Sequence, residues 1–135
     1  MPLVTWDASY SVNVATCDED HKKLFAVVNT LHEAMVDGKG FQLLPQIATQ
    51  LVDYTNLHFS REESLLEKTN FPGLNQHRAQ HRRFVKKVEQ FRQDLEAGRT
   101  VRSVLVLNYL KDWLTYHTKH IDRQYSAHLN KNGVF

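Results

Sequence analysis

The sequence predicts an all-α protein, an up-down-up-down antiparallel four-helix bundle with an N-terminal arm. Apolar residues recur at spacings of three and four along four long segments, which is the periodicity of an amphipathic helix. Short breaks rich in Gly and Pro separate these segments, and no linker or low-complexity run divides the chain. A chain of 135 residues can build a single core. We therefore expect one domain over residues 1–135, because short connections favour antiparallel neighbouring helices.

Residues 1–15 form the expected arm, since a disordered tail would not carry Trp6. Thr16 and Glu19 match a capping box at the start of the first helix, and Asn75 is the expected N-cap of the third. Glycines beyond the first and third segments are typical helix stops. The four helices are expected at about 16–37, 41–69, 75–97 and 101–130.

Composition and charge exclude several classes of protein. The formal net charge of +2 does not indicate nucleic-acid binding, and we interpret the basic residues on the outer face of helix 75–97 as a solvated surface. No run of about 20 apolar residues predicts a membrane span, and the N-terminus has no secretion signal. The single cysteine, Cys17, fits a reducing cytosol. We expect a cytoplasmic monomer, and the sequence indicates no protein partner.

Histidine is unusually frequent, with eight copies, and its positions follow the apolar stripes. His58 and Glu62 are four residues apart, as are His77 and His81, so each pair lies on one face of its helix. His21 continues the stripe of the first helix. His117 does the same in the fourth helix. Metal binding is the usual reason for such a set.

Counting residues from the turns places these side chains at one height in the bundle. His21 lies 17 residues before Gly38, and His58 lies 18 residues after Gly40. His81 lies 17 residues before Gly98, and His117 lies 17 residues after Thr100. At about 1.5 Å per residue, these mismatches amount to a few ångströms. A lone histidine on an apolar stripe is usually a hydrogen-bonded core residue, but four helices at one level favour a shared site.

Asp122 remains open on spacing alone. It follows His117 by five residues, about 140° around a regular helix. It reaches the same cavity only from the flank, or if the fourth helix is locally irregular. A buried Glu62 also needs a cation or a donor, because burying an unpaired carboxylate is costly.

These motifs, H-x3-E, H-x3-H and H-x4-D together with His21, resemble the hemerythrin family, most closely its single-domain bacterial members. The resemblance covers the whole chain, so residues 1–135 would form a hemerythrin-like domain. It implies two non-haem iron ions bridged by an oxo or hydroxo group and by the Glu62 and Asp122 carboxylates. One iron would be bound by His77, His81 and His117, and the other by His21 and His58.

The implied function is reversible O2 binding, for storage, delivery or scavenging, and not catalysis. Three histidines with three bridges fill six positions on one iron, whereas two histidines leave the other iron one position short. That vacancy is where O2 would bind. We expect an apolar pocket around it, and the candidate lining residues are Leu24, Phe59, Trp113, Leu114, Thr118 and Ile121.

Three alternatives stay open at this point. A di-iron oxidoreductase or peroxidase would use more carboxylates and Glu-x2-His motifs, and no Glu here is followed by His at the third position. Sensors of O2, redox state or nitric oxide are commonly fused to signalling domains, for which this chain has no room. A structural zinc site is a poor fit, since seven ligands exceed one zinc ion.

Two positions depart from the pattern of the family. Thr118 follows His117 where an aliphatic residue is common, and its hydroxyl could donate a hydrogen bond or admit water. Asp20 precedes His21 where Gln is common, and we expect its side chain to be exposed and without effect on the site.

Overall fold

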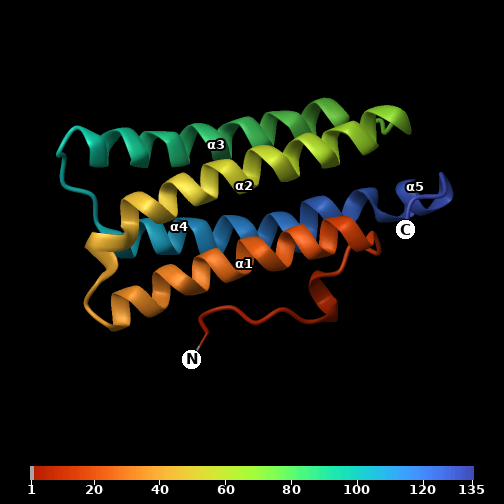
Figure 1. Ribbon diagram of the computed structural model, residues 1–135. Coiled ribbons are helices and arrows are strands. Elements are labelled where there is room, and N and C mark those ends of the chain that lie inside the picture. Colours follow the sequence, from red (N-terminus) through yellow and green to blue (C-terminus); the bar gives the residue numbers. More distant parts are fainter. Residues whose placement is uncertain (1) are drawn as a thin grey trace.

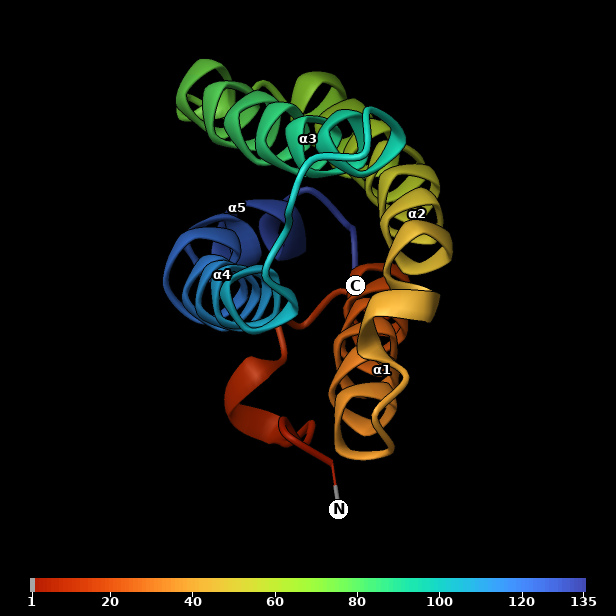
Figure 2. The ribbon, with the colours of Figure 1, turned by 90° about the vertical axis from the view of Figure 1, so that its left-hand side faces the viewer.

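Four long helices run up, down, up and down, as Figures 1 and 2 show, and the predicted fold class is confirmed. The computed structural model describes residues 2–135. Within that range no strand is present. The bounds of the long helices are α1 Ala15–Val36, α2 Gly40–Lys68, α3 Leu74–Glu96 and α4 Ser103–Tyr116.

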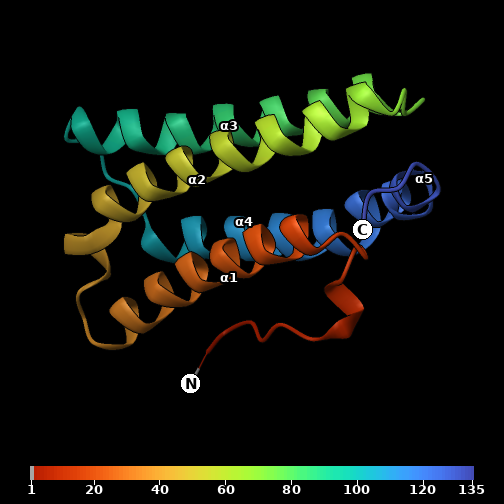
Figure 3. The ribbon, with the colours of Figure 1, turned by 45° about the vertical axis from the view of Figure 1, so that its right-hand side comes forward.

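The fourth segment is not one regular helix over 101–130. After α4 the chain forms a π-helix, η2, at His117–Ile121, then a 3-10 turn, η3, at Asp122–Tyr125, and then the short helix α5 at Ser126–Lys131. The irregular stretch lies at the level of the cluster described below, toward the end of the molecule where α5 lies (Figure 3).

Left-handed glycines end α1 and α3. Gly38 has a φ of 73° and Gly98 a φ of 74°, a region that side chains with a Cβ rarely adopt. The next residue in each case bonds back across the helix end, Lys39 N–H to Ala34 O at 2.7 Å and Arg99 N–H to Asp94 O at 2.8 Å. These are Schellman-type ends, and they place both turns at the same end of the bundle (Figure 1).

The two predicted N-caps are wrong. α1 begins at Ala15, and Thr16 lies exposed within it, while Asn75 lies inside α3, which begins at Leu74. Instead, a residue in the first turn of α1 bonds back to the segment that precedes the helix. Asp18 accepts hydrogen bonds from the Val12 N–H at 2.9 Å and the Ser11 hydroxyl at 2.6 Å.

The N-terminal arm packs across the bundle, as predicted. Tyr10 lies against both Trp6 and Phe25, with ring centroids 5.8 and 4.8 Å away. The Asn29 side chain of α1 accepts from the Val4 N–H at 3.0 Å and donates to the Val4 carbonyl at 2.8 Å. A short 3-10 turn, η1, at Ala8–Tyr10 lies next to the π-helix. The arm therefore contacts both α1 and the irregular segment.

In the part of the chain described, no helix combines the length and apolar character needed to cross a bilayer.

Candidate metal centre

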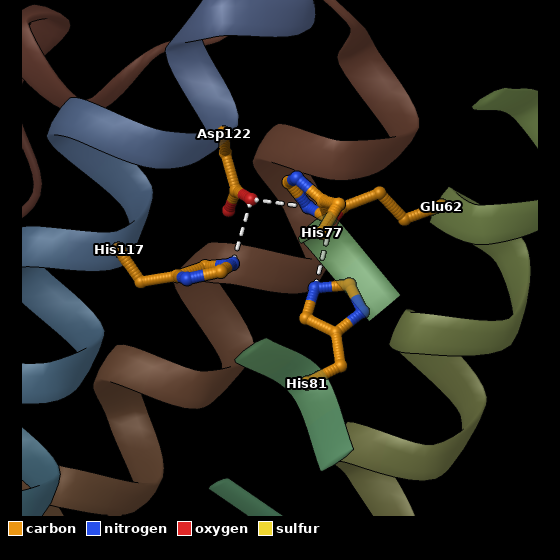
Figure 4. Close-up of side chains that lie close together, drawn as sticks. All are labelled: Glu62, His77, His81, His117 and Asp122. Atoms are coloured by element: carbon orange, nitrogen blue, oxygen red, sulfur yellow. Dashed lines mark hydrogen bonds and ion pairs between the residues drawn. The ribbon is translucent and has the colours of Figure 1, made fainter. Parts of the chain in front are cut away.

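Seven polar side chains from all four long segments meet inside the bundle. α1 contributes His21, α2 contributes His58 and Glu62, α3 contributes His77 and His81, and the irregular segment contributes His117 and Asp122. None of the seven is more than 4% exposed. Figure 4 shows five of them, with the three imidazoles of α3 and η2 turned toward the two carboxylates. The structure thus brings together all seven residues that the sequence singled out.

A π-turn brings Asp122 into this cluster. The Asp122 N–H bonds to the His117 carbonyl, so five residues close one turn and both side chains face the same way. His117 Nε2 lies 2.9 Å from Asp122 Oδ1. Of the two routes that spacing left open, local irregularity of the helix is therefore the one observed.

The seven side chains form two groups that share both carboxylates. One group holds Glu62 and Asp122 with His77, His81 and His117, and the other holds them with His21 and His58. Within each group the ligand atoms all lie within 4.8 Å of one another. One group therefore offers three imidazoles and the other two, around a common pair of carboxylates.

Glu62 is at the centre of the arrangement. Its Oε1 lies 2.6 Å from His77 Nε2 and 3.1 Å from His81 Nε2, and its Oε2 lies 3.1 Å from His58 Nε2. Asp122 spans the two groups in the same way, because its Oδ1 lies 3.0 Å from His77 Nε2 and its Oδ2 lies 3.1 Å from His21 Nε2. Each carboxylate thus turns one oxygen to each group.

Asp20 is buried, which contradicts the expectation that it is exposed. The residue is 8% exposed, and its Oδ2 lies 3.1 Å from His58 Nδ1. Arg61 donates to the same carboxylate at 3.0 and 3.2 Å. The reason is geometric, since α1 turns Asp20 toward α2 while His21 points into the core. A carboxylate on the outer nitrogen of a histidine fixes its ring so that Nε2 faces inward.

Glu63 orients the His81 ring as Asp20 orients that of His58, and the sequence analysis did not identify it. Its Oε2 lies 3.0 Å from His81 Nδ1, and Arg78 donates to its Oε1 at 3.2 Å. In each group, one histidine thus has a carboxylate at its Nδ1. An arginine in turn donates a hydrogen bond to that carboxylate. The sequence signal was present, because Glu63 follows Glu62 directly and lies on the adjacent side of α2.

A buried tyrosine next to the cluster forms a hydrogen bond with Glu62. Tyr125 is fully buried, and its hydroxyl donates to Glu62 Oε2 at 2.8 Å. The hydroxyl stays protonated, because burial and the Glu62 charge raise its pKa well above the usual value. Buried Cys17 belongs to the same apolar cluster as Tyr125. Its thiol is likewise held neutral, because burial and Glu62 raise its pKa.

Without metal, the cluster pairs protonated histidines such as His58 and His77 with the ionised Glu62 carboxylate. Burial opposes a charge on His58 and His77, but the surrounding carboxylates outweigh it and raise the pKa of each to about 10. Burial likewise opposes a charge on Glu62, and the neighbouring histidines hold its pKa well below the usual value. The cluster therefore needs positive charge at its centre, as protons or as cations.

The donor set fits iron. His81 Nε2, His117 Nε2 and Asp122 Oδ1 are buried and have no hydrogen-bond partner within residues 2–135, although they lie close to other cluster atoms. Buried polar atoms without a partner call for an explanation, and a bound cation would satisfy these three. Five imidazoles with two carboxylates are ligands that suit iron.

The six predicted pocket residues lie around the cluster with different exposure. Leu24, Phe59, Leu114 and Thr118 are buried, while Trp113 and Ile121 are half-buried. Phe59 stacks on His81 with ring centroids 3.7 Å apart, and Trp113 stacks on His117 at 4.2 Å. These two aromatic rings thus cover the three-histidine group. That the six residues line an O2 position stays a prediction.

The family of the chain follows from comparison with known sequences. Residues 12–129 match the family model of the hemerythrin HHE cation binding domain. The four-helix fold agrees with that match. So does the histidine–carboxylate cluster, because it could hold metal ions. This chain belongs to the hemerythrin family.

Individual relatives match over nearly their full lengths. The bacteriohemerythrin of Methylococcus capsulatus is 29% identical over 131 residues, covering 96% of this chain and 99% of the relative. A hemerythrin-like protein of Naegleria gruberi is 32% identical over 122 residues, 90% of each chain. The crystal structure of a wild-type hemerythrin superposes with a TM-score of 0.87 at 28% identity, covering 94% of this chain and 98% of that one.

Proposed function

We propose that this chain binds O2 reversibly at a pair of non-haem iron ions and is not an enzyme. The observation that carries the proposal is the unequal number of imidazoles in the two groups that share Glu62 and Asp122. The group of His21 and His58 has one donor fewer, which leaves room for a small ligand there. Membership of the hemerythrin family supports this assignment.

His77, His81 and His117 would hold one iron, His21 and His58 the other, and the two carboxylates would bridge them. When bound, the two ferrous ions would supply one electron each to O2, with an oxo or hydroxo bridge between them. Asp20 and Glu63 orient two of the imidazoles, one in each group. Tyr125 fixes the shared Glu62 by its hydrogen bond.

The protein around the cluster keeps water away from the open position. Leu24 and Leu114 are at most 4% exposed, and an apolar surrounding limits the access of solvent and protons to a metal site. We propose that this dry lining allows O2 to leave unchanged. A role in storage, delivery or scavenging is compatible with this chemistry.

An absorption spectrum tests the proposal. The iron-loaded protein, reduced without air, should gain a visible ligand-to-iron charge-transfer band on exposure to O2 and lose it on deoxygenation. Irreversible bleaching with turnover of an added reductant or peroxide would instead assign a di-iron oxidoreductase or peroxidase.

A matched pair of variants locates the binding site. His58→Leu removes a donor from the two-histidine group and should lower the iron content and abolish the reversible band. His120→Leu changes an exposed histidine of the same chain and should leave both unchanged. Retention of two irons and the full band in His58→Leu would contradict the ligand assignment.

A further inference from the structure

A strongly basic surface covers α3 on its outer side. Between residues 74 and 88 the sequence has five cationic side chains and no acidic one, whereas the whole chain has a formal net charge of only +2. We call this set the α3 basic face, and its members are Arg78, Arg82, Arg83, Lys86 and Lys87.

Four of these cations form no ion pair within residues 2–135, and three of the four also make no contact with an aromatic ring. Arg78 pairs with Glu63 and Glu67, and Lys87 lies over an aromatic ring. Arg82, Arg83 and Lys86 are exposed and form no ion pair within the described part of the chain. They therefore form a local positive field that can attract an acidic partner.

Two hollows flank α3 beside these cations, and each reaches an imidazole of the candidate metal centre. The first has a volume of about 330 Å³ and is lined by Arg82, Lys86, Phe59 and His81, among others. The second, of about 420 Å³, is lined by Arg83, Trp113 and His117, among others. The three-histidine group therefore lies close to the surface under the basic face.

Stacked aromatic rings back both imidazoles at these hollows. Phe59 and His81 are nearly parallel, with an interplanar angle of 4° and centroids 3.7 Å apart. Trp113 and His117 form a similar stack at 11° and 4.2 Å. Electron transfer slows steeply with the distance between donor and acceptor, so the surface over His81 and His117 provides a short entry to the cluster.

We propose that the α3 basic face is the docking surface for an acidic one-electron donor protein that keeps the centre in its O2-binding state. This inference rests on the proposed function, because O2 binding requires two ferrous ions. Two donor molecules would each lose one electron, and each of the two irons would pass from ferric to ferrous.

The charge pattern favours a protein over a nucleic acid or a membrane. The cations without an ion pair number four on one helix in the described part of the chain, and so few phosphate contacts would give only weak binding to a nucleic acid. The hollows beside the cations offer apolar and aromatic surface, which suits the core of a protein interface.

Stopped-flow reduction of the ferric, iron-loaded chain by a plant-type [2Fe–2S] ferredoxin tests the proposal. Raising the salt concentration from about 20 to about 200 mM should lower the second-order rate constant about ten-fold, because steered association weakens with ionic strength. Calorimetric titration of the two oxidised proteins gives the affinity without electron transfer.

Charge reversal locates the surface. The triple variant Arg82→Glu, Arg83→Glu, Lys86→Glu should lose at least about ten-fold in both rate and affinity, since like charges then face each other. The control Lys23→Glu, Lys39→Glu, Lys131→Glu makes the same charge change at exposed positions outside α3. The control should retain most of the rate of the wild type.

The outcomes separate this inference from the proposed function. Reduction of the triple variant with dithionite should restore normal O2 binding, which shows that its site is intact. Equal loss in both triple variants, or no loss in either, would overturn the docking surface while leaving O2 binding in place. Tighter binding of the wild type to a DNA duplex or to anionic vesicles than to ferredoxin would also overturn it.

Discussion

Asp20 illustrates how much one buried carboxylate adds to this site. Its contact with His58 Nδ1 at 3.1 Å and with Arg61 at 3.0 Å forms a carboxylate–imidazole pair behind the two-histidine group. Such partners orient a ligand histidine and increase its basicity. The residue that the sequence pattern marks as a departure from the family is therefore part of the supporting structure of the site.

Replacing Asp20 by Asn should weaken metal binding by about ten-fold or more, the range found for partners of ligand histidines. Asn keeps the size but loses the charge that holds Arg61 and His58 together. Competition with a chelator measures the affinity. Asp53→Asn, at an exposed position of α2, is the control, and equal affinities for the two variants would remove Asp20 from the site.

Thr118 has a buried hydroxyl with no partner. It is 1% exposed, and its Oγ1 forms no hydrogen bond in the described part of the chain. A free donor next to His117 can bond to a bound ligand or to an entering water.

We expect Thr118→Ile to lengthen the life of the O2-loaded protein about five-fold, the equivalent of one hydrogen bond of about 1 kcal/mol. The decay of the charge-transfer band in air measures it. Thr115→Ile removes a hydroxyl that already bonds to the Lys111 carbonyl and should not change the lifetime. The idea fails if Thr118→Ile decays at the rate of the wild type.

At the scale of elements, the π-helix η2 is the piece that completes the cluster. A regular helix would turn Asp122 about 140° away from His117, whereas the observed i→i+5 bond places the two on one face. The arm lies against this segment, with Lys119 of η2 over the Tyr10 ring at 5.2 Å and Arg123 donating to the Ser9 carbonyl at 3.3 Å. The arm thus supports the irregular turn from outside.

Trp6→Ala should lower the free energy of unfolding by about 2 kcal/mol. This is less than the loss expected on truncating a fully buried aromatic residue, because Trp6 is half-buried. Its ring packs on Phe25, with centroids 5.6 Å apart. Urea unfolding followed by circular dichroism measures the change. Phe41→Ala, at a residue that is 69% exposed, should change stability by less than about 0.5 kcal/mol. Equal effects would show that the arm is not docked.

At the scale of the whole molecule, metal and protons compete for one buried cluster. In the metal-free protein, the pKa of His58 and His77 rises from 6.5 to about 10. Their stabilising contribution is complete below pH 6.5 and is lost as the pH rises toward about 10. Glu62 has a lowered pKa, so its contribution is present above 4.5 and is lost as the pH falls below that value.

We therefore expect opposite pH trends with and without metal. Between pH 6.5 and 10 the metal-free protein should lose stability, whereas metal affinity should rise, because the ligand histidines must be deprotonated to bind. Urea midpoints measured across this range with iron and with excess chelator provide the test. Parallel trends in the two series would contradict the charge state assigned to the cluster.

The amino-acid pattern alone was sufficient for the four-helix bundle and for six of the seven residues that meet in it, while Asp122 was indicated only by the resemblance to the hemerythrin family. Helical periodicity and the distances of His21, His58, His81 and His117 from the turns determine which side chains share a level, and both quantities can be read from the chain. The bounds of three helices followed to within one residue, because Gly and Pro breaks mark where the helical segments end.

Tertiary packing decided what local pattern could not. The π-turn that turns Asp122 inward, the burial of Asp20 against α2 and the pairing of Glu63 with His81 all depend on neighbouring helices. The entry into α1 depends on buried Val12 and Val14 and on Asp18, so the capping-box pattern at Thr16 had no effect there. Sequence spacing specifies the direction of a side chain only while its helix stays regular. Which carboxylate approaches which imidazole is determined by contacts between segments that are far apart in the chain.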